Sequence, residues 1–291
     1  MKLARLLLVA HLGALIFGLA GLLIALPNPQ LWQGDPRAIG VFDFGMTYAG
    51  SLHIVLGAAA MVAWGVAALG WRRTMTFFWF AVPISLCSEL LGTTSGYPFG
   101  NYAYTDFLGY KVAGHVPFSI PLSWFYVGFA CYVLGVLIVD RLRLSPPWAW
   151  GVGLGVWFLT VWDLVLDPAM AHADLAVKFW EWSDTGPYFG MPVQNFVGWS
   201  LTALVFMGLS RMAWGADIEP AREHLSARFP FVVYAANTVF AAALSASVGL
   251  WIPILLAVVL GLVPATLALL RPSLPARTRA EGQAPLAAPS R

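Results

Sequence analysis

Eight long apolar stretches, separated by shorter polar or aromatic connections, run through the chain. About 20 predominantly apolar residues are enough for a helix to cross the hydrocarbon core of a bilayer. The pattern therefore predicts an all-α fold, a polytopic membrane bundle of about eight transmembrane helices that forms a single integral membrane domain over residues 1–270. The stretches cover roughly residues 6–26, 46–70, 76–92, 121–140, 147–167, 193–212, 229–248 and 250–270.

The two ends of this pattern need separate treatment. The first stretch follows Lys2 and Arg5 as a signal sequence would, but it is long and no clear small-residue cleavage site follows it, so we expect a retained span. The last two stretches are joined by a very short turn, which leaves seven spans as an alternative. Residues 271–291 are rich in Pro, Ala and Arg and predict a flexible C-terminal tail.

The positions of the basic residues test the number of spans. With eight spans, only Arg37, Lys111 and Lys178 of the 16 Lys and Arg residues fall on one side of the membrane. An excess of Lys and Arg marks the cytoplasmic side, so both termini are expected there. Seven spans would place the Arg-rich tail outside, and the charges therefore favour eight. We expect an integral protein of a bacterial-type cell inner membrane.

The composition agrees with a membrane protein. Hydrophobic residues make up 59% of the chain and charged residues 10%, against about 25% charged residues in soluble domains. This excludes a soluble enzyme, a disordered chain and a nucleic-acid-binding protein, and a net charge of +2 indicates no partner of opposite charge. Cys87 and Cys131 both lie inside apolar stretches, where we interpret them as packing residues rather than as a disulfide or a metal motif.

Two connections on the non-cytoplasmic side, about 93–120 and 168–192, differ from ordinary solvent-exposed loops. Both are rich in Tyr, Phe, Trp, Gly and Pro and carry few charges. Irregular backbone at membrane depth is tolerated only where protein buries it or where it lines a cavity. We therefore expect two pocket-lining loops folded back over the bundle. The alternative is an aromatic belt at the membrane interface, which accounts for isolated Trp and Tyr but not for the Gly and Pro residues.

Three acidic residues, Glu89, Asp163 and Asp167, lie within or at the ends of apolar stretches, all near the same side. A carboxyl group inside a membrane is costly unless it is paired or protonated, so each is a functional candidate. Asp163 and Asp167 are four residues apart and share one helix face. Two such groups can hold one proton between them, which suits general acid–base chemistry. The alternative is that each carboxylate ends a helix and faces interfacial water.

The remaining polar residues indicate no cofactor. His53, His115 and His172 lie on the same side as the carboxyl groups, but a lone His is more often structural, and His11 and His224 are expected to be incidental. No GxGxxG, P-loop or HExxH pattern is present, so no metal site and no cofactor are predicted. A carboxylic acid inside an aromatic cage suits a carbocation reaction on an isoprenoid lipid, because aromatic faces attract cations.

Long motifs within about residues 85–200 resemble the membrane carotenoid biosynthesis protein family. That family includes cofactor-independent carotenoid 1,2-hydratases acting on gamma-carotene, lycopene or bisanhydrobacterioruberin. The resemblance implies addition of water to the terminal C1=C2 double bond of a psi (open-chain) end group. The motifs are ELLGTTSGYPFGNYAY at 89–104, Val116-Pro117, PLSW at 121–124, WDLVLDP at 162–168, WEW at 180–182, GPYFGMP at 186–192 and NFVGW at 195–199.

Within that reaction we assign roles by inference. Asp163 is the acid that protonates C2, and Asp167 or Glu89 is the base that activates water at C1. The expected partners are an acyclic or monocyclic carotenoid, water, membrane lipid and other carotenoid enzymes, with no nucleic acid. The residues expected to bind substrate or water are Tyr97, Phe99, Asn101, Tyr102, Tyr104, His115, Trp124, Trp162, Trp182, Tyr188, Phe189, Asn195 and Trp199.

Three other functions stay open. A carotenoid or isoprenoid cyclase would use the same acid chemistry. A Mg²⁺-dependent membrane prenyltransferase would use Asp163 and Asp167 to hold a metal, but it needs a second Asp-rich motif and basic residues for the diphosphate. A lipid or carotenoid carrier, or a transporter, would need polar residues along a path through the whole membrane.

Overall fold

A computed structural model describes residues 1–215 and 226–270 of the chain. Within these residues, eight helices are long and apolar enough to cross a membrane, as the hydrophobic pattern predicts. The last two apolar stretches are separate helices, so the alternative of seven spans is wrong. The predicted tail at 271–291 and His224 lie outside the described residues. The spans are Lys2–Ala25, Pro36–Leu69, Trp71–Ser95, Ser119–Leu142, Pro147–Met170, Val193–Trp214, Arg228–Ser247 and Trp251–Leu269.

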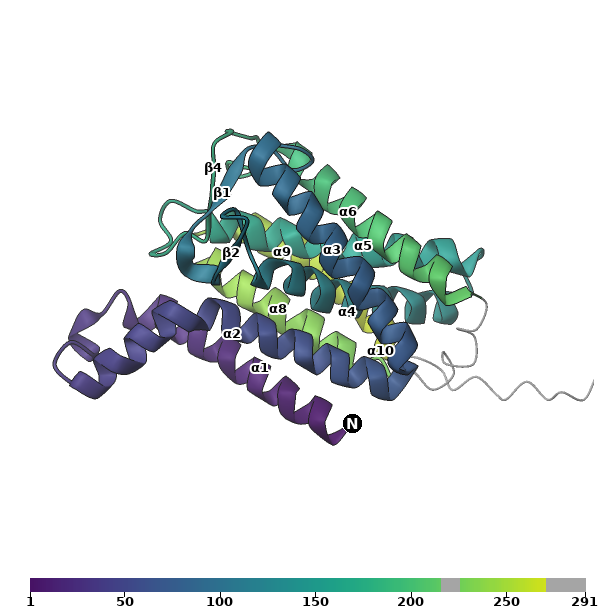
Figure 1. Cartoon of the computed structure of the whole chain (residues 1–291), viewed down its shortest axis with the longest axis horizontal. Coiled ribbons are helices and arrows are strands. Elements are labelled where there is room, and N and C mark those ends of the chain that lie inside the picture. Colours follow the sequence, from purple (N-terminus) through teal and green to yellow (C-terminus); the bar gives the residue numbers. More distant parts are fainter. Residues whose placement is uncertain (216–225, 271–291) are drawn as a thin grey trace, which may run out of the picture.

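The spans correspond to the helices labelled in Figure 1. Two spans contain a π-helical segment. In the first span α1 continues into η1, and in the last span η5 joins α9 to α10. The helical segments are α1 (Lys2–Ala20) with η1 (Gly21–Ala25), η2 (Pro29–Leu31), α2 (Pro36–Leu69), α3 (Trp71–Ser95), η3 (Asp106–Leu108), α4 (Ser119–Leu142), α5 (Pro147–Met170), α6 (Val193–Trp214), α8 (Arg228–Ser247), α9 (Trp251–Leu256), η5 (Ala257–Leu262) and α10 (Val263–Leu269).

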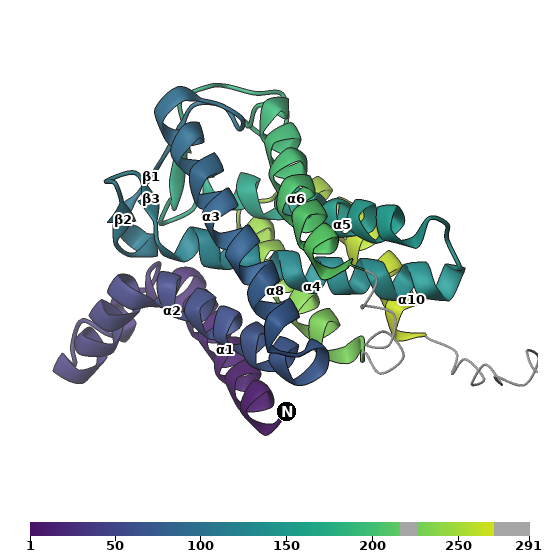
Figure 2. The same cartoon turned by 45° about the vertical axis from the view of Figure 1, so that its right-hand side comes forward.

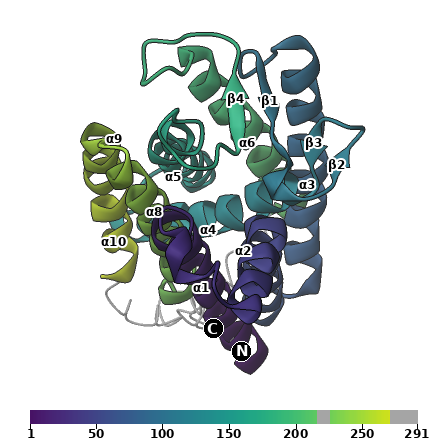
Figure 3. The same ribbon diagram turned by 90° about the vertical axis from the view of Figure 1, so that its left-hand side faces the viewer.

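Helix α4 is the centre of the bundle. Nearly all of its side chains are buried, and it packs against α2, α3, α5, α8 and α10, which surround it in the end-on view of Figure 3. The contact with α5 is close because glycines face each other. A Cβ atom added to Gly135 would lie 2.8 Å from the carbonyl oxygen of Gly151 and 2.9 Å from the amide nitrogen of Gly155. Small residues at such a crossing let two helix backbones approach.

Helices α1 and α2 form a hairpin at one side of the bundle. The hydrophobic pattern predicts α2 from about residue 46, but it begins at Pro36 and is 34 residues long. The cause is a helix start signal: the Asp35 carboxylate accepts a hydrogen bond from the Arg37 backbone at 2.8 Å, and Pro36 occupies the first turn. The hairpin's connecting end projects beyond the other helices in Figures 1 and 2.

The two aromatic connections pair with each other through short strands that the sequence analysis does not predict. Strand β1 (Tyr102–Tyr104) runs antiparallel to β4 (Trp180–Trp182), and Tyr102 lies opposite Trp182. In both strands the aromatic residues alternate with an exposed residue, Ala103 or Glu181, as the two-residue period of a strand requires. Because of this alternation, the aromatic rings of β1 and β4 face the bundle. A second, separate hairpin pairs β2 (Lys111–Val112) with β3 (Val116–Pro117).

The close contact between α4 and α5 gives a test of the packing. Replacement Gly135→Val forces the two backbones apart, and overpacking of this kind costs about 1–3 kcal/mol. We expect a lower melting temperature for the purified protein in detergent. Gly153→Val is the matched control on α5, because a Cβ atom there meets nothing within 4 Å. Equal melting temperatures for the two variants would contradict the packing.

Candidate active site

A chamber of about 60 Å³ lies between the helices beneath the β1–β4 sheet. Six of the spans and both aromatic connections contribute side chains to it. Glu89 comes from α3, Asp167 from α5 and Asn195 from α6. The other lining residues are His53, Ile54, Phe99, Tyr102, Tyr104, Leu108, Ile120, Ser123, Trp124, Tyr126, Trp162, Leu166, Met170, Trp180, Trp182, Trp199, Asn237 and Phe240. The expectation that the two connections line a pocket is confirmed.

Glu89 is buried, and each of its two carboxyl oxygens accepts at least one hydrogen bond. The hydroxyl groups of Tyr102 and Tyr104 both donate to Oε2, the latter at 2.8 Å, and the indole Nε1 of Trp124 donates to Oε1 at 2.8 Å. Burial and the nearby Glu89 charge raise the pKa of the Tyr102 and Tyr104 hydroxyls well above the usual value. Both hydroxyls therefore stay protonated at neutral pH and remain donors to Glu89.

Asp163 and Asp167 lie on one face of α5, and one amide group serves both. The Asn195 Nδ2 group donates to Asp163 Oδ2 at 2.9 Å and to Asp167 Oδ2 at 2.6 Å. All three side chains are buried. The second oxygen of Asp163, Oδ1, is buried with no hydrogen-bond partner among the described residues. Asp167 lines the chamber, whereas Asp163, one turn earlier on α5, lies behind it.

Aromatic rings form the walls around these groups. Trp124 and Trp199 are stacked with their centroids 4.0 Å apart, and Trp162 meets Trp199 edge-on at 6.0 Å. Tyr102 packs against Trp182 at 5.1 Å. The face of such a ring is electron-rich, whereas its edge carries partial positive charge. A positive charge that lay over one of these faces would be stabilised by it.

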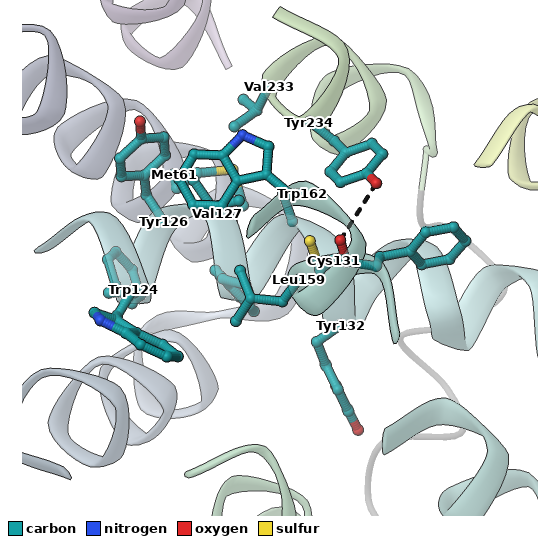
Figure 4. Close-up of a cluster of buried hydrophobic side chains, with 14 of the residues drawn as sticks. Met61, Trp124, Tyr126, Val127, Cys131, Tyr132, Leu159, Trp162, Val233 and Tyr234 are labelled. Atoms are coloured by element: carbon teal, nitrogen blue, oxygen red, sulfur yellow. Dashed lines mark hydrogen bonds between the residues drawn. The ribbon is translucent and has the colours of Figure 1, made fainter. Parts of the chain in front are cut away.

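Below the chamber, α4 and α5 join the apolar core. Figure 4 shows Trp124, Tyr126 and Trp162, which also line the chamber, in one cluster of buried side chains with Cys131. The side chain of Cys131 is buried, as expected of a packing residue. Cys87 is exposed on the surface of α3, so the same interpretation is wrong for it, because its side chain faces away from the other helices.

A buried polar network borders the chamber on the side of α2 and α8. The Nδ1 atom of His53 lies 3.0 Å from the carbonyl of Ala49, and His11 Nδ1 lies 2.7 Å from the carbonyl of His53. The Asn237 amide lies 3.2 Å from His11 Nε2 and accepts a hydrogen bond from the Tyr126 hydroxyl at 2.6 Å. His11 therefore joins α1, α2 and α8 through buried hydrogen bonds, a structural role that leaves its predicted lack of a functional role untested.

The structure brings most of the predicted site residues together. Ten of them line the chamber: Glu89, Phe99, Tyr102, Tyr104, Trp124, Trp162, Asp167, Trp182, Asn195 and Trp199. Lining residues that the sequence analysis does not predict include Trp180, which the alternation in β4 indicates once the strand is recognised. His53, Tyr126 and Asn237 are not predicted either, because they come from three different spans and only the packing of the helices brings them together.

Six predicted residues do not line the chamber: Tyr97, Asn101, His115, Asp163, Tyr188 and Phe189. Tyr97 and Phe189 are 74% and 39% exposed, and His115 is exposed in the β2–β3 hairpin. The Asn101 amide donates to Asp184 at 2.9 Å and so joins the two connections. The Tyr188 hydroxyl donates to the carbonyl of Leu164 at 3.0 Å. We correct their assignment to the chamber wall, because their exposure or the contacts described here place them outside its lining.

Within residues 1–215 and 226–270, no group of three or more His, Cys, Asp or Glu side chains is arranged to hold a metal ion. Both oxygens of Glu89 accept hydrogen bonds from tyrosine or tryptophan donors, and one oxygen each of Asp163 and Asp167 accepts from Asn195. Buried carboxyl groups of this kind can take up or release a proton.

The helices and the chamber define an integral membrane protein with buried acidic groups in an aromatic site. The profile of the family described as carotenoid biosynthesis protein matches residues 49–264, and the chain belongs to this family. A bisanhydrobacterioruberin hydratase from Haloarcula japonica is 29% identical over 194 residues. That match spans 66% of this chain and 61% of the relative, less than two thirds of its length. No solved structure matches the chain.

The shared amide of Asn195 generates a prediction about stability. Asn195→Leu leaves two buried carboxyl groups without a donor, and a lost hydrogen bond to a charged group costs about 1.5–3 kcal/mol. The further change Asp163→Asn restores an amide donor beside Asp167. We therefore expect Asp163→Asn to raise the melting temperature of the Asn195→Leu protein and to lower that of the wild type. Effects that simply add in the double mutant would contradict the shared hydrogen bonds.

Proposed function

We propose that the protein adds water across the terminal C1=C2 double bond of the psi end group of an acyclic or monocyclic carotenoid. The observation that carries this proposal is the pair Glu89 and Asp167, which face one aromatic chamber without a metal-ligand cluster in the described residues. The family membership and the name of the archaeal relative support the substrate class and the reaction.

In the proposed reaction, Asp167 transfers its proton to C2 of the end group. The electron pair of the double bond forms the new C–H bond and leaves a tertiary cation at C1. The oxygen of a water molecule then attacks C1, and Glu89 takes the proton that this water loses. A proton passing back from Glu89 to Asp167 completes the cycle, so the net change is the addition of one water molecule. The hydroxyl group is placed at C1 because the tertiary cation forms there.

This assignment moves the acid from Asp163 to Asp167. Asp167 lines the chamber and Asp163 does not, so only Asp167 can touch the substrate. Asp163 is a positioning residue, since it shares the Asn195 amide with Asp167 and lies close enough for the two charges to interact. Glu89 is assigned as the base because its oxygens accept three hydrogen bonds, an arrangement that suits a carboxylate.

The aromatic wall supplies the remaining requirement, which is stabilisation of the cation. Trp124 and Trp199 are stacked on each other. The Trp124 indole donates a hydrogen bond to Glu89, which places this pair of rings beside the carboxyl group. A cation over desolvated indole faces gains about 2 kcal/mol or more. The same wall excludes bulk water, so a short-lived cation meets only the water admitted to the chamber.

We also propose an orientation in a bacterial-type inner membrane. The N-terminus, the α2–α3 turn and the α4–α5 turn lie at the opposite end of the bundle from β1 and β4 in Figure 1. Arg72, Arg73, Arg141 and Arg143 belong to these turns, so the positive-inside rule places this end, and both termini, in the cytoplasm. The strand-covered chamber then lies toward the other side, where membrane lipid and other carotenoid enzymes are the proposed neighbours.

The first experiment is expression in a host that accumulates lycopene, followed by mass spectrometry of the pigments. Hydration adds the mass of one water molecule to the pigment. An isomer of unchanged mass would indicate a cyclase, and prenyl addition that EDTA abolishes would indicate a prenyltransferase. Carotenoid that is bound but never altered would indicate a carrier. Each of these three results would contradict the hydratase proposal.

Asp167→Asn tests the proposed acid. An amide cannot donate a carboxylic proton, and loss of general acid catalysis lowers rates by about 10²–10⁴-fold. We expect hydrated pigment to fall by at least about 100-fold while the protein keeps its elution volume in detergent. Asp106→Asn is the control, because the Asp106 side chain is 94% exposed and paired with Lys111. Normal hydration by Asp167→Asn would refute the assignment.

A further inference from the structure

A second cavity, with a volume of about 500 Å³, lies beside the chamber. One wall is the α1–α2 hairpin, from the end of α1 and η1 to the first half of α2. The other wall comes from the aromatic connections, α5 and α8. We call this cavity the hairpin groove, and its lining residues are Phe17, Gly18, Ala20, Gly21, Leu22, Ile24, Ala25, Leu31, Trp32, Ala38, Val41, Phe42, Gly45, Met46, Ala49, Gly50, His53, Phe107, Met170, Val177, Phe179 and Phe240.

The hairpin groove adjoins the chamber directly. His53, Met170 and Phe240 line both cavities, so these three side chains form the junction between them. The chamber alone, at about 60 Å³, holds only the tip of a large molecule. The hairpin groove has the volume of a ligand pocket, which is typically about 300–1,000 Å³. Together the two cavities fit a ligand with a small reactive end and a long remainder.

The chemistry of the hairpin groove restricts that remainder to hydrocarbon. Its lining contains no Asp, Glu, Lys or Arg side chain, and its polar side-chain atoms belong to His53 and Trp32 alone. The Trp32 indole nitrogen already donates to the carbonyl of Ala25 at 2.9 Å, and its ring is stacked on Phe42 with centroids 3.8 Å apart. A polar ligand would lose its water here without gaining partners. Flat rings of this kind pack well against a flat, conjugated chain.

We propose that the hairpin groove binds the polyene chain of the carotenoid while its end group passes His53 into the chamber. This inference rests on the proposed function and extends it to the orientation of the substrate. The unusual length of α2 has a role in this arrangement, because its first half forms one wall of the groove. Only one end of a carotenoid reaches the carboxyl groups at a time, so a substrate with two open ends must be released and rebound to react twice.

The test fills the hairpin groove with a larger side chain. Met46→Trp places an indole in the groove, whereas Tyr48→Trp, two residues later on α2, is the matched control. Tyr48 is 54% exposed and does not line the groove or the chamber. Both changes are made in full-length wild type and in the Asp167→Asn protein, which traps unreacted substrate under the proposed mechanism. All proteins are purified from lycopene-producing cells and compared by size-exclusion chromatography.

The readouts are the lycopene retained per protein by the Asp167→Asn series and the hydrated pigment made by the active series. We expect Met46→Trp to lower both by about tenfold or more, since a misfit in an apolar pocket costs about 1–3 kcal/mol. Tyr48→Trp should leave both unchanged. If Met46→Trp retains and hydrates lycopene as the control does, the groove proposal is overturned and the hydratase proposal stands. If Met46→Trp leaves both readouts unchanged but lowers the phospholipid that co-purifies, measured on the same samples, the groove is a lipid site and the proposal is likewise wrong.

These outcomes separate the two proposals. A wild type that never hydrates a carotenoid contradicts the proposed function, whatever the groove variants do. Pigment retention still tests the groove in that case, because it is measured without turnover. Misfolding of Met46→Trp would appear as a shifted elution volume, and Ala38→Phe then takes its place, since Ala38 lines the same wall nearer the start of α2.

Discussion

Burial of three carboxyl groups among apolar helices is the constraint on which the rest of the structure depends. A charged or polar group in the membrane is costly without partners, so Glu89, Asp163 and Asp167 each need donors that the neighbouring helices cannot supply through their backbones. Tyr102, Tyr104 and Trp124 serve Glu89, and Asn195 serves the other two. The same partners that satisfy the acids bring α3, α4, α5, α6 and β1 to one chamber.

The aromatic sheet over the chamber follows from this requirement. Tyrosine hydroxyls can reach Glu89 only if residues 102–104 are held against the bundle, and pairing with Trp180–Trp182 holds them there. The Asn101 amide, bonded to Asp184, reinforces that pairing at its edge. Stability and the proposed chemistry are therefore joined, because the groups that fold the two connections also form the aromatic wall of the chamber, which would face the carbocation in the proposed reaction.

The sequence predicts the spans and the acids better than it predicts the orientation of the loop residues. Hydrophobic length gives the eight helices, and the four-residue spacing gives the common face of Asp163 and Asp167. Tyr97 and Tyr102 are equally aromatic in the sequence, yet one is exposed and the other buried. That difference depends on a strand pairing between segments about 80 residues apart, which local pattern does not reveal. The hairpin groove is not predicted for the same reason, since the α1–α2 hairpin meets α5, α8 and the aromatic connections only through long-range packing.

The central claim is that a carboxyl group in the chamber adds a solvent-derived proton to C2 and that water supplies the oxygen at C1. The most direct measurement is conversion of lycopene by the purified protein in deuterated water and, separately, in oxygen-18 water, with the label located by mass spectrometry and NMR. The account predicts one deuterium at C2 and the heavy oxygen at C1 in each hydrated end group. A product without deuterium at C2, or with its oxygen from another source, would contradict it.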